Sequence, residues 1–94
     1  MTPDEYQTET YKTAKQNYGV DRLAYLTIGL TGEAGEVANN VKKIFRDKTI
    51  RREEILEELG DCLWYIAQLC EYFTANLEDV MHNNIEKLRR RYSC

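Results

Sequence analysis

Apolar side chains recur along this chain every three to four residues, which is the spacing of amphipathic helices, and no segment alternates as a strand does. The only proline is Pro3, so nothing after it forbids continuous helix. Capping and terminating residues divide the pattern into four helices. They are expected at about 3–17, 22–45, 50–75 and 77–91, capped by Thr2, Asp21, Thr49 and Asn76, with Gly19 ending the first. The pattern predicts an all-α, compact four-helix bundle that forms one domain over residues 1–94.

One charged residue interrupts the heptad seam of the second predicted helix. The seam of that helix is Leu23, Leu26, Leu30, Glu33, Val37, Asn40 and Ile44, and that of the third is Leu59, Cys62, Ile66, Leu69 and Phe73. Glu33 therefore occupies a position that should be buried. An ionised carboxylate in such a place must be paired, protonated or bound to a metal ion.

Composition and charge exclude several classes of protein. The 94 residues are 43% apolar and 31% charged, which is typical of a soluble globular chain. Thirteen basic residues against sixteen acidic ones give a net charge of −3, which argues against a dedicated nucleic-acid binder. No apolar run is long enough to span a membrane, and the polar N-terminus does not resemble a signal peptide. Three cysteines without a CxxC pair, and one histidine, favour reduced thiols in the cytoplasm over a zinc site.

Two pairs of carboxylates lie three residues apart in segments that are otherwise nearly free of charge. These pairs are Glu33 with Glu36, and Glu58 with Asp61. Residues three apart share a helix face, so each pair projects together. If the second and third helices pack side by side, all four carboxylates converge on one cleft. Hard divalent cations relieve such repulsion, and ligation by oxygen alone suits magnesium or manganese rather than zinc.

Plainer interpretations of these acids remain open. An ExxE pair on a helix is often a solvated face, and a buried salt bridge to Lys42, Lys43 or Arg22 is the strongest competing explanation. Glu57 follows a run of charged residues, so it can equally be a surface residue. Four glycines near the acids have two uses, either close contact between helices or open space for metal, water and phosphate. They are Gly29, Gly32, Gly35 and Gly60.

These motifs resemble the MazG-like all-α nucleoside triphosphate pyrophosphohydrolases. The resemblance rests on GEAGEV at 32–37, on Lys42-Lys43, and on EELGDCLWY at 57–65. The family's hallmark is ExxE, a spacer and then ExxD, and here 21 residues separate Glu36 from Glu58. The Asn-x-x-Lys segment beginning at Asn84 and the opening Glu-Tyr-Gln also look family-like, so the resemblance covers nearly the whole chain.

The resemblance implies a magnesium-dependent hydrolase, with manganese as a substitute, that acts in nucleotide-pool clean-up or regulation. It would split an NTP or dNTP between the α- and β-phosphates, giving a nucleoside monophosphate and pyrophosphate. The residues carried over as metal-binding and catalytic are Glu33, Glu36, Glu58 and Asp61. Those carried over as substrate-binding are Lys43, Asn84, Lys87 and Arg91 for the phosphates or sugar, and Trp64 and Tyr65 for the base. Trp64 and Tyr65 have an alternative interpretation, in which they pack in the core or at an interface instead of contacting the base.

The same residues are compatible with other functions. Phosphoribosyl-ATP is the alternative substrate, although that enzyme family usually carries Tyr-His where this chain has Trp64-Tyr65. A non-catalytic helical interaction module would use the acids only for partner choice. A nucleic-acid binder would use the basic residues near the C-terminus, namely Lys87, Arg89, Arg90 and Arg91. The single Asp79–His82 pair is too little for a di-iron site.

The second and third helices carry more apolar surface than one short chain can cover. The sequence therefore predicts a homodimer or a dimer of dimers, with no nucleic-acid polymer and no membrane as partner. A neighbouring chain would then complete the site by donating Lys87 or Arg91 in trans.

Overall fold

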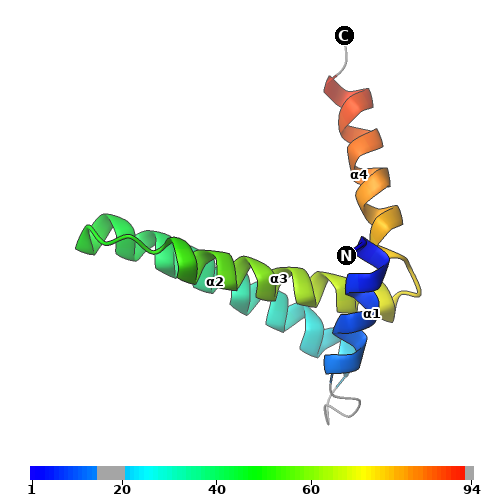
Figure 1. The fold of residues 1–94 in the computed structure, drawn as a ribbon, viewed down its shortest axis with the longest axis horizontal. Helices are drawn as coiled ribbons and strands as arrows, with labels where there is room; N and C mark the ends of the chain where they lie inside the picture. Colours follow the sequence, from blue (N-terminus) through cyan, green and yellow to red (C-terminus); the bar gives the residue numbers. More distant parts are fainter. Residues whose placement is uncertain (15–20, 93–94) are drawn as a thin grey trace.

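The chain folds into four α-helices in the computed structural model, which describes residues 1–14 and 21–92 (Figure 1). The helices are α1 Pro3–Thr13, α2 Arg22–Asp47, α3 Arg52–Tyr72 and α4 Leu77–Tyr92. No strand occurs within the described residues. The all-α prediction is therefore confirmed. None of the described helices is long and apolar enough to cross a bilayer.

Two of the expected helix starts are made by side-chain caps. The Thr2 hydroxyl accepts a hydrogen bond from the Glu5 backbone N–H at 3.1 Å, and the Glu5 carboxylate accepts one from the Thr2 N–H at 2.7 Å. This reciprocal pair is a capping box. The Asp21 carboxylate accepts from the Ala24 N–H at 3.1 Å and caps α2. Local sequence alone places these two starts.

Three of the expected helix boundaries are wrong. Helix α1 ends at Thr13 with Ala14 extended, and the expected end near Asn17 and Gly19 lies outside the described residues. Lys48 adopts a left-handed backbone (φ 57°) that ends α2, and α3 begins at Arg52 without a side-chain cap, so Thr49 does not cap it. Helix α3 ends at Tyr72 instead of continuing to about residue 75, because Thr74 also takes the left-handed conformation (φ 56°).

Helices α2 and α3 form a long antiparallel hairpin, while α1 and α4 lie at its base (Figure 1). Helix α1 packs across the end of α3 and against α4, and α4 then stands away from the hairpin. The radius of gyration is 15.7 Å, whereas a compact chain of this length has one of about 12 Å. The single chain is thus an open, angular molecule. The expectation of a compact bundle is wrong for one chain, because α4 does not return along the hairpin.

The core is small and unusually polar. Its buried apolar cluster is Ala67, Cys70 and Leu77, with Tyr6 packed against it. A buried chain of hydrogen bonds lies beside this cluster. Gln68 is fully buried, accepts from the Arg22 guanidinium at 2.7 Å and donates to the Thr10 hydroxyl at 2.9 Å. This chain of hydrogen bonds connects α1, α2 and α3, so it fixes how they pack at the base of the hairpin.

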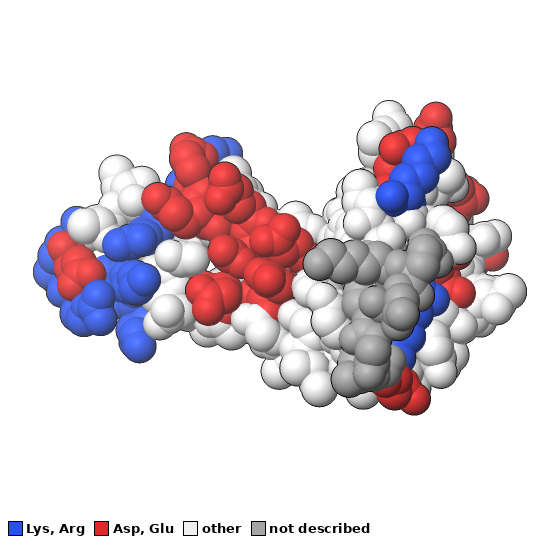
Figure 2. Space-filling view, turned by 90° about the horizontal axis from the view of Figure 1, so that it is seen from below, with Lys and Arg blue, Asp and Glu red and all other residues white. Residues whose placement is uncertain are grey.

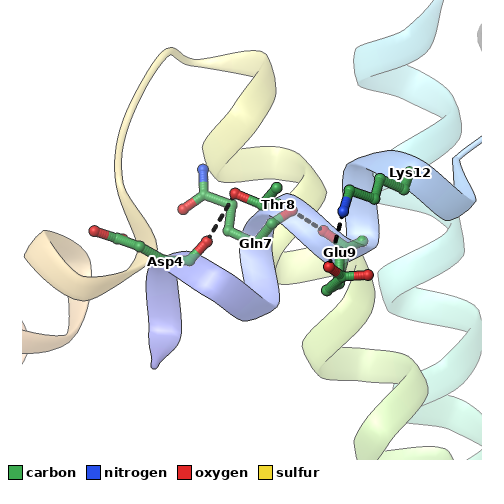
Figure 3. Close-up of polar contacts among 6 residues, drawn as sticks. Asp4, Gln7, Thr8, Glu9 and Lys12 are labelled. Carbon is green, nitrogen blue, oxygen red and sulfur yellow. Dashed lines mark hydrogen bonds and ion pairs between the residues drawn. The ribbon is translucent and has the colours of Figure 1, made fainter. Parts of the chain in front are cut away.

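Gln7 attaches α1 to the turn between α3 and α4. Its side-chain amide donates to the Glu71 carboxylate at 3.0 Å and to the Ala75 carbonyl at 2.8 Å, and its oxygen accepts from the Leu77 N–H at 2.6 Å. The start of α4 is therefore capped by a residue seventy positions earlier. Elsewhere on α1 the contacts include local ones, such as the hydrogen bond from the Thr8 hydroxyl to the Asp4 carbonyl (Figure 3).

Candidate metal centre

Three carboxylates meet between the two helices of the hairpin. Glu33 comes from α2, and Glu58 and Asp61 come from α3. One oxygen from each side chain lies within 4.8 Å of the others, which is close enough for all three to hold one metal ion. Glu33 and Glu58 are half-buried and Asp61 is exposed, so the cluster is open to a ligand from solvent.

The negative charges of the carboxylates in and beside the cluster act on one another. The pKa of Glu33 is raised from its ordinary 4.5 to about 7. The first cause is a hydrogen bond with Glu58, and partial burial and the charges of Asp61, Glu58 and Glu36 add to it. Two carboxylates that share a hydrogen bond hold a proton between them, because both cannot ionise without repulsion. A divalent cation removes that repulsion.

The competing salt-bridge explanation is wrong within the described part of the chain. None of the ion pairs found there involves a residue of the cluster. The Arg22 guanidinium is directed to Gln68, at the base of the hairpin. Among the described residues the acids therefore meet without a basic partner at contact distance, which is what a cation site requires.

Glu36 lies outside this three-carboxylate group. It is exposed one helical turn beyond Glu33 and borders a separate hollow that Gly32, Gly35 and Lys42 also line. Figure 2 shows the acidic side chains gathered on one face of the hairpin, with lysines and arginines at its far end. Lys43, the expected phosphate contact, is half-buried on α2 toward that basic end.

Two aromatic side chains border the acids. Trp64 and Tyr65 line a hollow of about 330 Å³ together with Glu33 and Asp61. Their rings meet edge to face with centroids 5.1 Å apart, and the Trp64 indole N–H donates to the Thr13 hydroxyl at 2.8 Å. Both rings are half-buried, so each contributes to packing and still faces the hollow.

The structure shows which glycines allow close contact between helices and which leave open space beside the acids. A Cβ at Gly29 would run into the ring of Tyr65, so this glycine allows a close contact between α2 and α3. A Cβ at Gly32, Gly35 or Gly60 would meet nothing within 4 Å. Open space beside the acids is thus found at three glycines, and close helix contact at one.

The expected residues of α4 do not reach the acids within one chain. Asn84, Lys87 and Arg91 are exposed on a helix that packs at the base and then stands away from the hairpin. His82 faces Glu78 at 3.8 Å instead of forming a metal-binding group with Asp79. Sequence reasoning missed Thr13 as the partner of Trp64. No local signal marks that hydrogen bond, because the two residues lie 51 positions apart.

Comparison with known proteins identifies the family of this chain. The family description "MazG nucleotide pyrophosphohydrolase domain" matches residues 23–93, which include α3, α4 and all of α2 except Arg22. The chain belongs to the MazG nucleotide pyrophosphohydrolase family. The family resemblance seen in the sequence is thereby confirmed, and the three clustered carboxylates lie within the matched residues.

Two individual proteins are also similar in sequence to this chain. The chain is 43% identical to the Gene 37 protein of Mycobacterium phage L5, over 97% of this chain and 89% of that protein. It is 37% identical to the Uncharacterized protein YvdC of Bacillus subtilis (strain 168), over 72% of this chain and 74% of that one. No solved structure matches the chain.

Proposed function

We propose that this MazG chain hydrolyses a nucleoside triphosphate, ribo or deoxyribo, between the α- and β-phosphates. Water adds its oxygen to the α-phosphorus, the bond to the bridging oxygen breaks, and a nucleoside monophosphate, pyrophosphate and a proton are released. The observation that carries the proposal is the three-carboxylate group of Glu33, Glu58 and Asp61, which lacks a basic partner among the described residues. A cytoplasmic location belongs to the proposal, because the substrate is a soluble nucleotide.

The donor set fits magnesium, with manganese as a substitute. All three ligand atoms are carboxylate oxygens, which hard divalent cations prefer. When bound, such an ion would supply positive charge against the phosphates and lower the pKa of the attacking water. Glu33, Glu58 and Asp61 would hold the ion, and Glu36 would add a fourth carboxylate one helical turn along α2. Any one of these carboxylates can accept the proton of the water.

The remaining roles concern the substrate. Trp64 and Tyr65 line the hollow next to the acids, where a nucleobase would stack on them. Lys43 lies toward the basic end of the hairpin, where it would neutralise phosphate charge. Asn84, Lys87 and Arg91 would act from the α4 of a neighbouring copy, in a homodimer or a dimer of dimers.

The test is pyrophosphate release from a panel of NTPs and dNTPs, with magnesium and with EDTA. We expect release that requires magnesium and falls at least a hundredfold in Glu58→Gln, because the substitution removes an anionic ligand. Glu53→Gln is the matched control: it makes the same change in the first turn of α3, where Glu53 is exposed and paired with Arg52. This variant should keep wild-type activity.

The other results distinguish the alternatives. Magnesium binding without release from any panel nucleotide would contradict the proposed substrates and direct the search to phosphoribosyl-ATP. If magnesium produces no thermal shift and no nucleotide is cleaved, the chain is a non-catalytic helical module. Equal loss of activity in Glu53→Gln and Glu58→Gln would show that the cluster has no special role.

A further inference from the structure

The indole nitrogen of Trp64 is held by a helix that lies outside the hairpin. Its N–H donates to the hydroxyl of Thr13, the last residue of α1, at 2.8 Å. Trp64 itself is half-buried on α3 and lines the hollow of about 330 Å³ together with Glu33 and Asp61. This hydrogen bond therefore connects α1 to the wall of the candidate site.

The Thr13 hydroxyl that accepts this bond is itself held in place. It donates its own proton to the Thr10 carbonyl at 2.9 Å, which leaves its oxygen lone pairs for the indole N–H. Thr10 is buried, and its hydroxyl accepts from the side-chain amide of the buried Gln68 at 2.9 Å. Contacts thus run from the indole through the last turn of α1 to the polar core at the base of the hairpin.

A second contact holds the indole ring. The rings of Trp64 and Tyr65 meet edge to face at an interplanar angle of 83°. The Tyr65 ring lies against the backbone of α2, because a Cβ at Gly29 would run into it. An indole turns about two side-chain torsions. Contacts at its nitrogen and at its ring restrict both of them, so three helices together determine how Trp64 lies in the hollow.

We propose that Thr13 is a positioning residue, which fixes the Trp64 ring in the wall of the hollow before a nucleotide binds. The inference rests on the proposed function, because it takes a nucleobase to be the occupant of that hollow. A side chain that is already held in its binding orientation loses less conformational freedom on binding, and this raises the affinity. Thr13 therefore strengthens substrate binding without touching the substrate.

The same hydrogen bond affects how Trp64 treats different bases. An indole has one hydrogen-bond donor and no acceptor. Because Thr13 engages that donor, the contact left to Trp64 is stacking, and every base offers a face on which an aromatic ring can stack. Trp64 therefore adds affinity for any nucleotide and does not select one base over another.

The first test is kcat and KM for the nucleotide panel in variants of Thr13. Thr13→Val keeps the shape of the side chain but cannot accept the hydrogen bond. KM should rise about three- to tenfold, by the same factor for every nucleotide, because one neutral hydrogen bond is lost. The value of kcat should stay unchanged, because the carboxylates are untouched. Thr13→Ser keeps the hydroxyl and should restore KM to within about twofold of the wild type.

Thr8→Val is the matched control for Thr13→Val. It makes the same change on α1, at a hydroxyl that bonds the Asp4 carbonyl, and should leave kcat and KM as in the wild type. Far-ultraviolet circular dichroism checks that every variant remains helical.

The second test reads Trp64 directly, because it is the chain's only tryptophan. The probes are nucleotides with a methylene group in place of the α–β bridging oxygen, which cannot be hydrolysed at that position. They should quench the fluorescence of the wild type to saturation. The dissociation constant should be about three- to tenfold higher in Thr13→Val, and near the wild-type value in Thr13→Ser.

Wild-type KM and dissociation constants in Thr13→Val would overturn the inference. A fall in kcat without a rise in KM, a rise in KM for one nucleotide alone, or no recovery in Thr13→Ser would overturn it as well. Quenching that depends on Thr13 without any hydrolysis would contradict the proposed reaction alone. Hydrolysis that is insensitive to Thr13→Val would contradict the inference alone, and a wild type with neither quenching nor hydrolysis would contradict both.

Discussion

Two glycines three residues apart on α2 have different environments, although the sequence gives them the same context. A Cβ at Gly29 meets the Tyr65 ring, whereas one at Gly32 meets open space. Gly29→Ala should lower the free energy of unfolding by about 1–3 kcal/mol, because the ring must move in a packed contact. Gly32→Ala should raise it by about 0.5–1 kcal/mol, because alanine is the better helix former.

Urea unfolding at one fixed protein concentration measures both effects. The two variants make the same chemical change in the same helix, so each is the control for the other. Equal shifts in the two variants, in either direction, would contradict the assignment of Gly29 as the close contact between α2 and α3.

Glu33 makes stability depend on pH in a definite direction. Its pKa is raised from 4.5 to about 7, so between these values the folded chain holds a proton that the unfolded chain releases. Without metal, the free energy of unfolding should therefore fall as the pH rises from about 4.5 to 7. Magnesium competes with this proton, so the stabilisation by magnesium should be larger at pH 8 than at pH 5.5.

Thermal unfolding in EDTA and in magnesium, at both pH values, checks this expectation. Glu33→Gln has no proton to lose at that position and should flatten the dependence in EDTA. A stability in EDTA that rises across this pH window would contradict the shared proton.

At the scale of the element, one residue of α1 determines where α4 begins. Gln7 is buried and bonds the Glu71 side chain, the Ala75 carbonyl and the Leu77 N–H. Gln7→Ala should lower the free energy of unfolding by about 1–3 kcal/mol, because it leaves buried polar groups without partners. Urea unfolding measures this change.

Thr8→Ala is the matched control for Gln7→Ala. Thr8 is the next residue of the same helix, and its hydroxyl contacts only the Asp4 carbonyl on the exposed side (Figure 3). This variant should change stability by less than about 0.5 kcal/mol. If the two variants unfold alike, the attachment of α1 to α4 contributes nothing measurable.

At the scale of the whole molecule, the chain exposes an apolar surface on one side of its hairpin and an acidic surface on the other. The radius of gyration of 15.7 Å reflects an α4 that stands away from the hairpin. Small chains bury little apolar surface by themselves. The homodimer that belongs to the proposed function would supply further contacts, and it would bring the α4 residues of one copy to the acids of another. Stability and substrate binding would then share one interface.

The four helices, the caps at Thr2 and Asp21, and the family could all be predicted from the sequence. These features depend on hydrogen bonds within one helical turn and on the periodicity of apolar side chains. Both are determined by residues that are close together in the sequence. The sequence also indicated that acids would converge between the second and third helices. The ends of α2 and α3 could not be predicted in this way. Lys48 and Thr74 adopt a left-handed backbone there, although neither residue type favours that conformation.

Which acids meet depends on how the helices pack. The packing of α2 on α3 brings Glu33 to Glu58 and Asp61, and leaves Glu36 one turn away. That outcome depends on how two helices are rotated and shifted along each other, which contacts such as Gly29 on Tyr65 determine. The direction of α4 likewise depends on a hydrogen bond from Leu77 to Gln7, seventy positions apart. Interactions over such separations arise from packing, so no local pattern in the sequence records them.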